Sequence, residues 1–397
     1  MKYTKLFQRG VMIMTLLCGI FMFMSLRLSD DPSMIKIKSS PYGSMWFSET
    51  SNGDVYFITS NLKFEDDTAL GIYRYNVQQK QLKLITSLKN IGLKQPASAL
   101  TAGENGMLYG VDMSAGHGNA GAIYSVNEQN NRVEIVYQFR RKDDIQHPQL
   151  GLVKVAPDLF YGIGINKGNV AVYSFNSKSK RVNTLQLTTD TLSFAPLLPV
   201  YSGDSLLYIS ARKSNSKSDD CTSLLVYNLN TEKIIRVIDV TTDMNFASGW
   251  VKAADGNLYR NSHYSINFTG NAVSMQFLKV NPRVGAVEQI VDPFKDFSTF
   301  SGPASIDQLG RVVFSYVYGG PDNCGGIGYL DLLTDTVAYI KVWSREEPGC
   351  ITSNYAGLFV HSGGDIFAVG SGGDESVLYR MNHSTGKGIV IARFVRQ

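Results

Sequence analysis

The sequence predicts an all-β fold: a seven-bladed β-propeller with four antiparallel strands per blade, behind an N-terminal signal peptide or signal anchor. Two observations predict the propeller. One unit recurs seven times with a period of roughly 50 residues, as blade-sized repeats do, and no segment after residue 30 shows sustained helical periodicity. A sandwich array is the alternative, and the single period argues against it. The aromatic residue that marks the same strand in each copy is Tyr56, Tyr109, Tyr161, Tyr208, Tyr259, Phe314 or Phe367.

Each copy carries the signals for four strands, named A to D in chain order. The turn pairs Asn52-Gly53, Asn105-Gly106 and Asp255-Gly256 supply the positive φ angles of a tight hairpin between strands A and B. Strand C ends in a Tyr-x-apolar-Asn signature, because Asn favours the next turn. The sixth copy departs from the signature and the fifth keeps only its Asn281. The other copies read Tyr73…Asn76, Tyr124…Asn127, Tyr173…Asn176, Tyr227…Asn230 and Tyr379…Asn382.

The N-terminus has the layout of an export signal. Lys2, Lys5 and Arg9 precede the uncharged run 11–26, which is short for a membrane span of about 20 residues. No small-residue cleavage site follows, so cleavage, retention as an anchor and lipidation at Cys18 all stay open. We expect the body to be secreted or to lie in the periplasm or cell envelope, touching a membrane only through residues 11–26 if these are retained. The strand-like residues 34–37 suit pairing with an outer strand of a blade.

These elements divide the chain into three parts: a signal peptide or anchor over residues 1–28, a linker over 29–42 and the propeller over 43–397. The predicted blades are approximately 43–90, 91–140, 141–188, 189–240, 241–293, 294–343 and 344–397.

The charge balance argues against nucleic acid as a partner. The chain has 38 Lys and Arg against 34 Asp and Glu. Four of the basic residues, Lys2, Lys5, Arg9 and Arg27, precede every acidic residue, so the exported body is neutral. Nucleic-acid binding depends on neutralising phosphates, and a neutral body offers no general attraction of that kind.

The cysteines predict one disulfide. In a propeller the B–C loops and the D–A connections share one face. Cys324 falls in the sixth B–C loop and Cys350 in the connection to the seventh blade, so these two are predicted to pair, as an exported protein permits. Cys221, in the fourth B–C loop, is predicted to be free. Three unpaired thiols are the alternative.

One copy resembles a known repeat. Leu108-Tyr109-Gly110, then Gly116 and Gly118, then Gly121-Ala122-Ile123-Tyr124 are similar to the tandem extracellular repeats called GloVer. The resemblance is clear in the second copy and dilute in the other six. It implies an exported bacterial propeller and no particular chemistry.

The rule that B–C loops and D–A connections share one face also places a set of cationic and aromatic side chains together on that face. The candidate catalytic residues are His117, His147, His263 and Tyr264, and the candidate substrate-binding residues are Lys167, Arg212, Arg260, Tyr316, Tyr318 and Arg345. Arg binds carboxylate or sulfate in a bidentate manner, and Tyr stacks on sugar rings. This composition favours an acidic polysaccharide as the ligand. For a single loop histidine, an ordinary solvated residue is the competing interpretation.

β-Elimination of a 4-linked uronate fits such a face. The reaction needs a cation on the carboxylate, a His or Tyr base for the neighbouring C–H, and an acid for the leaving oxygen. Some ulvan lyases are seven-bladed propellers, so the chain is similar to these polysaccharide lyases in architecture and export; no catalytic motif carries over. The alternative is a noncatalytic envelope scaffold that docks another protein.

Other chemistries lack their motifs. The five histidines have no H-x-x-H or H-E-x-x-H spacing, so no metal site is predicted. There is no nucleophile elbow for Ser-His-Asp catalysis and no P-loop. No cofactor is predicted. Calcium stays open, because Asp66-Asp67 with Glu65, and Asp219-Asp220, are carboxylate groups on loops.

Overall fold

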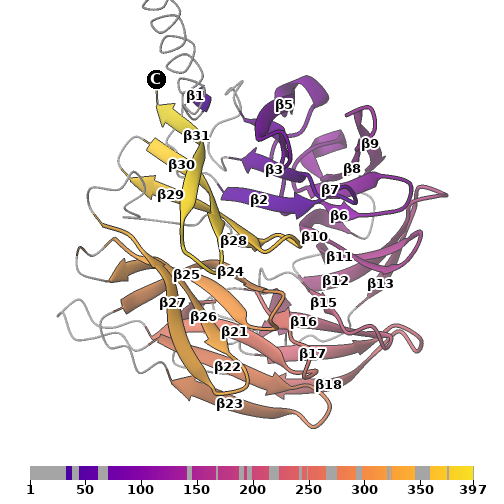
Figure 1. Ribbon diagram of the computed structural model, residues 1–397. Helices are drawn as coiled ribbons and strands as arrows, with labels where there is room; N and C mark the ends of the chain where they lie inside the picture. Colours follow the sequence, from indigo (N-terminus) through magenta and orange to yellow (C-terminus); the bar gives the residue numbers. More distant parts are fainter. Residues whose placement is uncertain are drawn as a thin grey trace, which may run out of the picture.

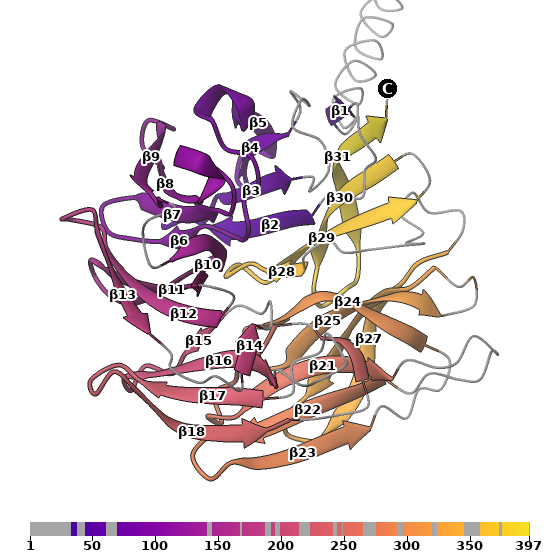
Figure 2. The same ribbon diagram turned by 180° about the vertical axis from the view of Figure 1, so that it is seen from behind.

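The computed structural model describes residues 33–37, 44–60, 70–140, 145–166, 169–186, 192–194, 199–213, 223–240, 244–247, 249–264, 275–291, 297–319, 322, 324–344, 358–372 and 375–396. These residues form strands and two short 3-10 helices, η1 (Lys89–Ile91) and η2 (His117–Asn119). The strands make seven sheets arranged in a ring (Figure 1, Figure 2). The predicted all-β fold of seven four-stranded antiparallel blades is confirmed.

The first three blades follow the A-B-C-D order without exception. Blade 1 contains β2 (Ser44–Glu49), β3 (Val55–Ser60), β4 (Gly71–Asn76) and β5 (Gln81–Ser87). Blade 2 contains β6 (Thr101–Ala102), β7 (Met107–Asp112), β8 (Ala122–Asn127) and β9 (Val133–Gln138). Blade 3 contains β10 (Gln146–Ala156), β11 (Leu159–Asn166), β12 (Asn169–Asn176) and β13 (Arg181–Gln186).

In blades 4 and 5 two short strands share the A position. Blade 4 contains β14 (Leu192–Phe194), β15 (Val200–Tyr201), β16 (Leu206–Lys213), β17 (Ser223–Asn228) and β18 (Lys233–Asp239). Blade 5 contains β19 (Met244–Ala247), β20 (Val251–Lys252), β21 (Leu258–Tyr264), β22 (Met275–Asn281) and β23 (Ala286–Val291).

Blades 6 and 7 complete the ring, and blade 7 has an additional strand at its outer edge. Blade 6 contains β24 (Phe297–Ile306), β25 (Val312–Gly319), β26 (Gly326–Asp331) and β27 (Thr336–Val342). Blade 7 contains β28 (Leu358–Val360), β29 (Asp365–Gly372), β30 (Glu375–Asn382) and β31 (Gly388–Arg396), with β1 (Ser33–Ile37) beside β31. A strands of neighbouring blades contact one another, for example β2 with β6 and with β28, so the A strands lie nearest the ring axis.

The turns explain why this sequence makes hairpins. In blade 2, Asn105 (φ 54°) and Gly106 (φ 69°) both adopt the left-handed conformation that a two-residue turn needs. The Asn at the end of strand C accepts backbone N–H groups of the next turn, as Asn127 does from Gln129 and Asn130. In the sixth copy Asp331 takes this role and accepts the N–H of Leu333.

One position of the predicted signature is wrong. In blade 4 the residue that ends strand C is Asn228, whose side chain accepts the N–H groups of Asn230 and Thr231. A register shift between Val226 and Tyr227 accompanies it. Tyr227 therefore stands two residues later in its strand than the repeat tyrosines do.

The core consists of layers between blades rather than a single centre. Among the described residues, the buried apolar side chains form seven clusters, and each cluster joins two adjacent blades. The seven predicted marker aromatics are all buried. Tyr109 of blade 2, for example, packs on Phe160 and Phe175 of blade 3, with ring centroids 5.1 and 5.7 Å away. Burying these rings between blades is what holds neighbouring sheets together.

The ring closes between blades 7 and 1 through backbone and side-chain contacts. Strand β1 pairs in parallel with β31, from Ser33 opposite Ala392 to Ile37 opposite Arg396, which confirms the predicted pairing of residues 34–37 with an outer strand. Near the inner strands, the imidazole of His361 donates from Nε2 to the Gly53 carbonyl at 2.8 Å.

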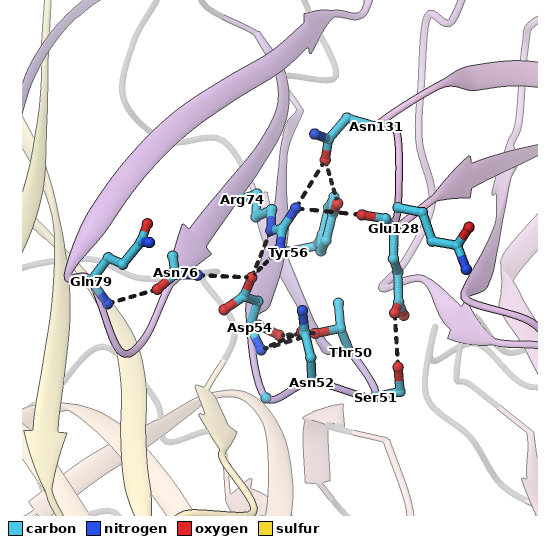
Figure 3. Close-up of polar contacts among 12 residues, drawn as sticks. Thr50, Ser51, Asn52, Asp54, Tyr56, Arg74, Asn76, Gln79, Glu128 and Asn131 are labelled. Atoms are coloured by element: carbon cyan, nitrogen blue, oxygen red, sulfur yellow. Dashed lines mark hydrogen bonds and ion pairs between the residues drawn. The ribbon is translucent and has the colours of Figure 1, made fainter.

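Arginine side chains make a second kind of contact between blades. Arg74 on β4 donates to the Asp54 carboxylate from Nε at 2.7 Å and from Nη2 at 2.5 Å (Figure 3). Its Nη1 crosses to blade 2, at 3.4 Å from the Glu128 carbonyl and 3.4 Å from Asn131 Oδ1. The Tyr56 hydroxyl donates to the same Asn131 oxygen at 2.8 Å. This polar cluster is satisfied internally and is therefore structural.

Blade 7 repeats the arrangement. Arg380 on β30 donates to Asp365 from Nε and Nη2, each at 2.6 Å, and from Nη1 to the Val77 carbonyl of blade 1 at 3.2 Å. Val77 and Glu128 both follow the turn asparagine of their blade. The same carbonyl position thus receives an arginine from the preceding blade at both boundaries.

Candidate functional site on the B–C loop face

One part of the predicted functional face lies between blades 2 and 3, where the structure describes the side chains of two loops. It is made from the B–C loop of blade 2, the connection that enters blade 2, and the start of β10 in blade 3. We call these residues, 94–95, 112–121 and 145–148, the blade 2–3 loop site. No described helix has the length and apolar character needed to cross a membrane.

Asp112, the last residue of β7, organises this site. Its carboxylate is buried and accepts four backbone N–H groups. Oδ2 receives those of Lys94 and Gln95 at 2.7 and 2.8 Å, and Oδ1 receives those of Ser114 and Ala115 at 2.9 and 2.6 Å. Burial raises the pKa of this carboxyl, while the four N–H donors act in the opposite direction. One side chain thereby fixes two loops.

Gly121 lets the loop of blade 2 approach blade 3 closely. Its φ of +103° disfavours any residue with a Cβ, and an added Cβ would stand 2.2 Å from Cδ of Pro148. The Gly121 carbonyl accepts the N–H of Phe139 at 3.0 Å. Glycine is therefore needed here for both conformation and space.

His147 is exposed, and its imidazole orientation is set by the loop of blade 2. Its backbone N–H donates to the Ala120 carbonyl at 2.8 Å, and its Nδ1 lies 3.1 Å from the Met113 carbonyl. Because a carbonyl only accepts, Nδ1 carries the proton and Nε2 keeps a free lone pair in the neutral ring. His147 also has a φ of +49°, a strained value of the kind that clusters at functional sites.

His117 and Lys94 lie on the same loop cluster. His117 begins η2 and is exposed. Lys94 Nζ donates to Asn119 Oδ1 at 3.1 Å, and the next residue, Ala120, holds the backbone of His147. One short loop thus carries His117 and is contacted by the Lys94 ammonium and by the His147 backbone. The sequence analysis missed Lys94, although its place in a connection that enters a blade assigns it to this face by the same rule.

Two predicted substrate-binding residues are buried instead. Arg260 is 2% exposed, and its guanidinium carbon lies 5.4 Å from the centre of the Trp250 ring. Tyr316 is fully buried, packs on Tyr339, and donates its hydroxyl to the Lys341 carbonyl at 3.3 Å. Both belong to the middle of a B strand, where neighbouring blades cover both faces. Their assignment to an open binding face is wrong.

The remaining predicted residues are placed only by their backbone or not at all. Arg212 pairs with Ser193, His263 with Asn245, Tyr264 with Met244 and Tyr318 with Ser298. Each stands at or near the end of a B strand, and the structure does not describe its side chain, so its role in the site stays a prediction. Lys167 and Arg345 lie outside the described residues.

Cys324 is buried and disulfide-bonded. The predicted partner Cys350 lies outside the described residues, as does Cys221, so the pairing of Cys324 with Cys350 stays a prediction. The acidic groups at 65–67 and 219–220, named above for calcium, also lie outside them.

Comparison with known proteins gives the fold and no family. No family model matches the sequence, and no curated protein matches it. An oligogalacturonate lyase from Vibrio parahaemolyticus is similar over 90% of this chain and 89% of its own, with 11% identity and a TM-score of 0.55. A protein from Lactobacillus plantarum is similar over 87% and 96%, with 14% identity and a TM-score of 0.57.

A second oligogalacturonate lyase, in complex with manganese, is similar over 90% of this chain and 97% of its own, with 10% identity and a TM-score of 0.51. The described residues of this chain contain no group of three His, Cys, Asp or Glu side chains that could hold a metal. At these identities, the chain is similar to these proteins in fold alone.

Proposed function

We propose that this chain is an exported propeller that binds an acidic polysaccharide at the blade 2–3 loop site and cleaves it by β-elimination. The observation that carries the proposal is His147. It is exposed, it has a strained backbone, and the Met113 carbonyl fixes its ring so that Nε2 is the basic nitrogen. An imidazole whose basic nitrogen is fixed by its hydrogen bonds is suited to general-base catalysis.

The neighbouring groups supply the other two roles. The Lys94 ammonium would pair with the uronate carboxylate, which makes the adjacent C–H more acidic because the cation stabilises charge that develops on the carboxylate. His147 Nε2 would take that proton, and the C4–O bond would break. His117, acting as the acid, would give a proton to the leaving oxygen, so that one unsaturated uronate and one new hydroxyl are formed.

The choice of ligand has two supports. The loop site gathers one ammonium and two imidazoles, which favours an anionic ligand. Two structural neighbours are named oligogalacturonate lyases, and although that likeness shows fold alone, it makes polygalacturonate the first probe. Export rests on the N-terminal sequence and on the resemblance of the second copy to GloVer repeats.

The test is ultraviolet absorbance while residues 29–397 meet polygalacturonate, alginate and ulvan. Cleavage by β-elimination creates an absorbing unsaturated uronate, whereas binding alone does not. We expect a rising signal on one substrate, a loss of about 100-fold or more in kcat for His147→Gln, and no change for His383→Gln. His383 is a matched control because it lies in the turn after β30, on the opposite face.

The outcomes separate the two parts of the proposal. If calorimetry detects binding but the absorbance does not change, the proposed polysaccharide-binding site stands and the proposed lyase activity is rejected. A panel with neither binding nor cleavage would overturn both. Equal activity of His147→Gln and the unmodified protein would remove His147 from the reaction.

The alternative, a noncatalytic envelope scaffold, is favoured by a different surface. Ile235 and Val237 on β18 and Val284 in the next blade are 55%, 51% and 71% exposed. Ile235 and Val237 share one side of β18, because side chains two residues apart in a strand point the same way; Val284 is a separate exposed side chain. An exposed apolar group of this kind suits a protein partner. A partner from envelope extract whose binding survives Val237→Asp would argue against this surface.

A further inference from the structure

We infer that Asp112 is a positioning residue for His147 and acts on it through the peptide group between Met113 and Ser114. The inference builds on the proposed function, since it assigns the group that makes His147 a base. It concerns the protonated nitrogen of His147, however, and that nitrogen can be measured without any substrate.

The connection runs through one rigid unit. A trans peptide is planar, with its carbonyl and its N–H pointing in opposite directions. The Ser114 N–H of this unit donates to Asp112 Oδ1 at 2.9 Å. The Met113 carbonyl of the same unit therefore points away from Asp112, and it accepts from His147 Nδ1 at 3.1 Å. Fixing one end of the peptide plane fixes the other.

Four further hydrogen bonds make the peptide plane hard to rotate. Asp112 also accepts the Ala115 N–H at 2.6 Å, and its second oxygen accepts Lys94 and Gln95. The Met113 N–H donates to the Gln95 carbonyl at 2.9 Å. The two loops are thereby tied together on both sides of Met113. A carboxylate suits this place because it is a pure acceptor with room for four donors.

His361 has the opposite arrangement of donor and acceptor nitrogens from His147. His361 accepts the Gly363 N–H at Nδ1, 2.8 Å away, and donates from Nε2 to the Gly53 carbonyl at 2.8 Å. The two histidines are therefore expected to carry their protons on different nitrogens, His147 on Nδ1 and His361 on Nε2. His361 lies between blades 7 and 1, away from the loop site, and reports whether the fold is intact.

The experiment is two-bond ¹H–¹⁵N correlation spectroscopy on the full chain, labelled with ¹⁵N at its five histidines and held at a pH where they are neutral. The spectrum of His147→Gln identifies the His147 signals. We expect the Nδ1–H pattern for His147 and the Nε2–H pattern for His361. In Asp112→Asn the amide cannot accept all four N–H groups, so His147 should shift toward the Nε2–H form while His361 stays unchanged.

Two results would overturn the inference: an Nε2–H pattern for His147 in the unmodified protein, or an unchanged Nδ1–H pattern in Asp112→Asn that keeps its His361 signals. Asp112→Glu, which retains the charge, serves as a milder variant. If neither variant folds, the spectrum of the unmodified protein still tests the inference, because an Nε2–H pattern for His147 overturns it. A positioning role further predicts a fall in kcat of about 10-fold or more for Asp112→Asn.

Failure of this inference and failure of the proposed function are distinguishable. An Nδ1–H pattern that depends on Asp112, without cleavage of any polysaccharide, would keep the positioning role and reject the lyase. Cleavage that depends on His147 but not on Asp112 would keep the lyase and reject the positioning role.

Discussion

Replacing Arg74 with Met tests whether arginines hold adjacent blades together. The change keeps the length of the apolar stem and removes the contacts to Asp54, Glu128 and Asn131. The Asp54 side chain is only 4% exposed and the Arg74 side chain 23% exposed, so the variant leaves a buried carboxylate without its cation. Removing one partner of a buried pair costs about 3–5 kcal/mol. Since Asp54 retains Asn76 Nδ2 at 3.3 Å, we expect about 3 kcal/mol.

The assay is urea unfolding followed by tryptophan fluorescence, with Arg132→Met as the matched control. Arg132 pairs with Glu134 at 3.1 Å, but its side chain is 74% exposed, and exposed pairs contribute about 0.5 kcal/mol or less. The reasoning would be refuted if the two variants differed by less than about 1 kcal/mol in free energy of unfolding. A double-mutant cycle with Asp54→Asn should give a coupling of about 2 kcal/mol.

Three further predictions concern a close approach, an outer edge and a tyrosine. Gly121→Ala should destabilise the protein by about 2–4 kcal/mol, because its Cβ would meet Pro148 at 2.2 Å and the backbone is left-handed; a change in the urea midpoint no larger than for Gly203→Ala, which has open space, would contradict the steric part. A chain that begins at Ser39 should exchange the amides of β31 faster than one that begins at Ser29, because the β1 partner is gone; equal protection would mean that β1 adds nothing. Burial, followed by the charges of Glu232 and Tyr161, raises the pKa of Tyr227 to about 12. The unfolded chain ionises first, near pH 10, so this contribution to stability is complete below pH 10 and is lost as the pH rises toward 12; Tyr227→Phe should flatten that fall in urea midpoints.

Local signals made the fold predictable from the sequence. Hairpin turns need particular residues, and Asn105-Gly106 adopts the predicted conformation. The marker aromatics recur because every B strand lies between two neighbouring blades and needs a large apolar side chain there. The same fact explains the errors. Sorting residues by loop face works for loops, but Arg260 and Tyr316 stand within B strands that are covered on both sides.

The arrangement of the site depends on contacts that no local pattern encodes. His117 and His147 were assigned to one face by topology. The basic nitrogen of His147 depends on a carbonyl 34 residues earlier in the chain, and Lys94 reaches the site because Asp112 binds its backbone. A strand pattern indicates where a loop emerges, whereas the direction of a carbonyl within that loop follows only from the assembled bonds.

The pairing of β1 with β31 has a consequence for the order of events during synthesis. Ile37 lies opposite Arg396, so β1 waits for a partner strand that is made about 360 residues later. At a synthesis rate of about 5–20 residues per second, that wait is roughly 20–80 s. During it the early blades fold against their neighbours in sequence, while the side of blade 1 that faces blade 7 is uncovered. Blade 7 then completes the ring, so a ribosome that stops before β28 releases an open array of blades in which the aromatic side of blade 1 is uncovered.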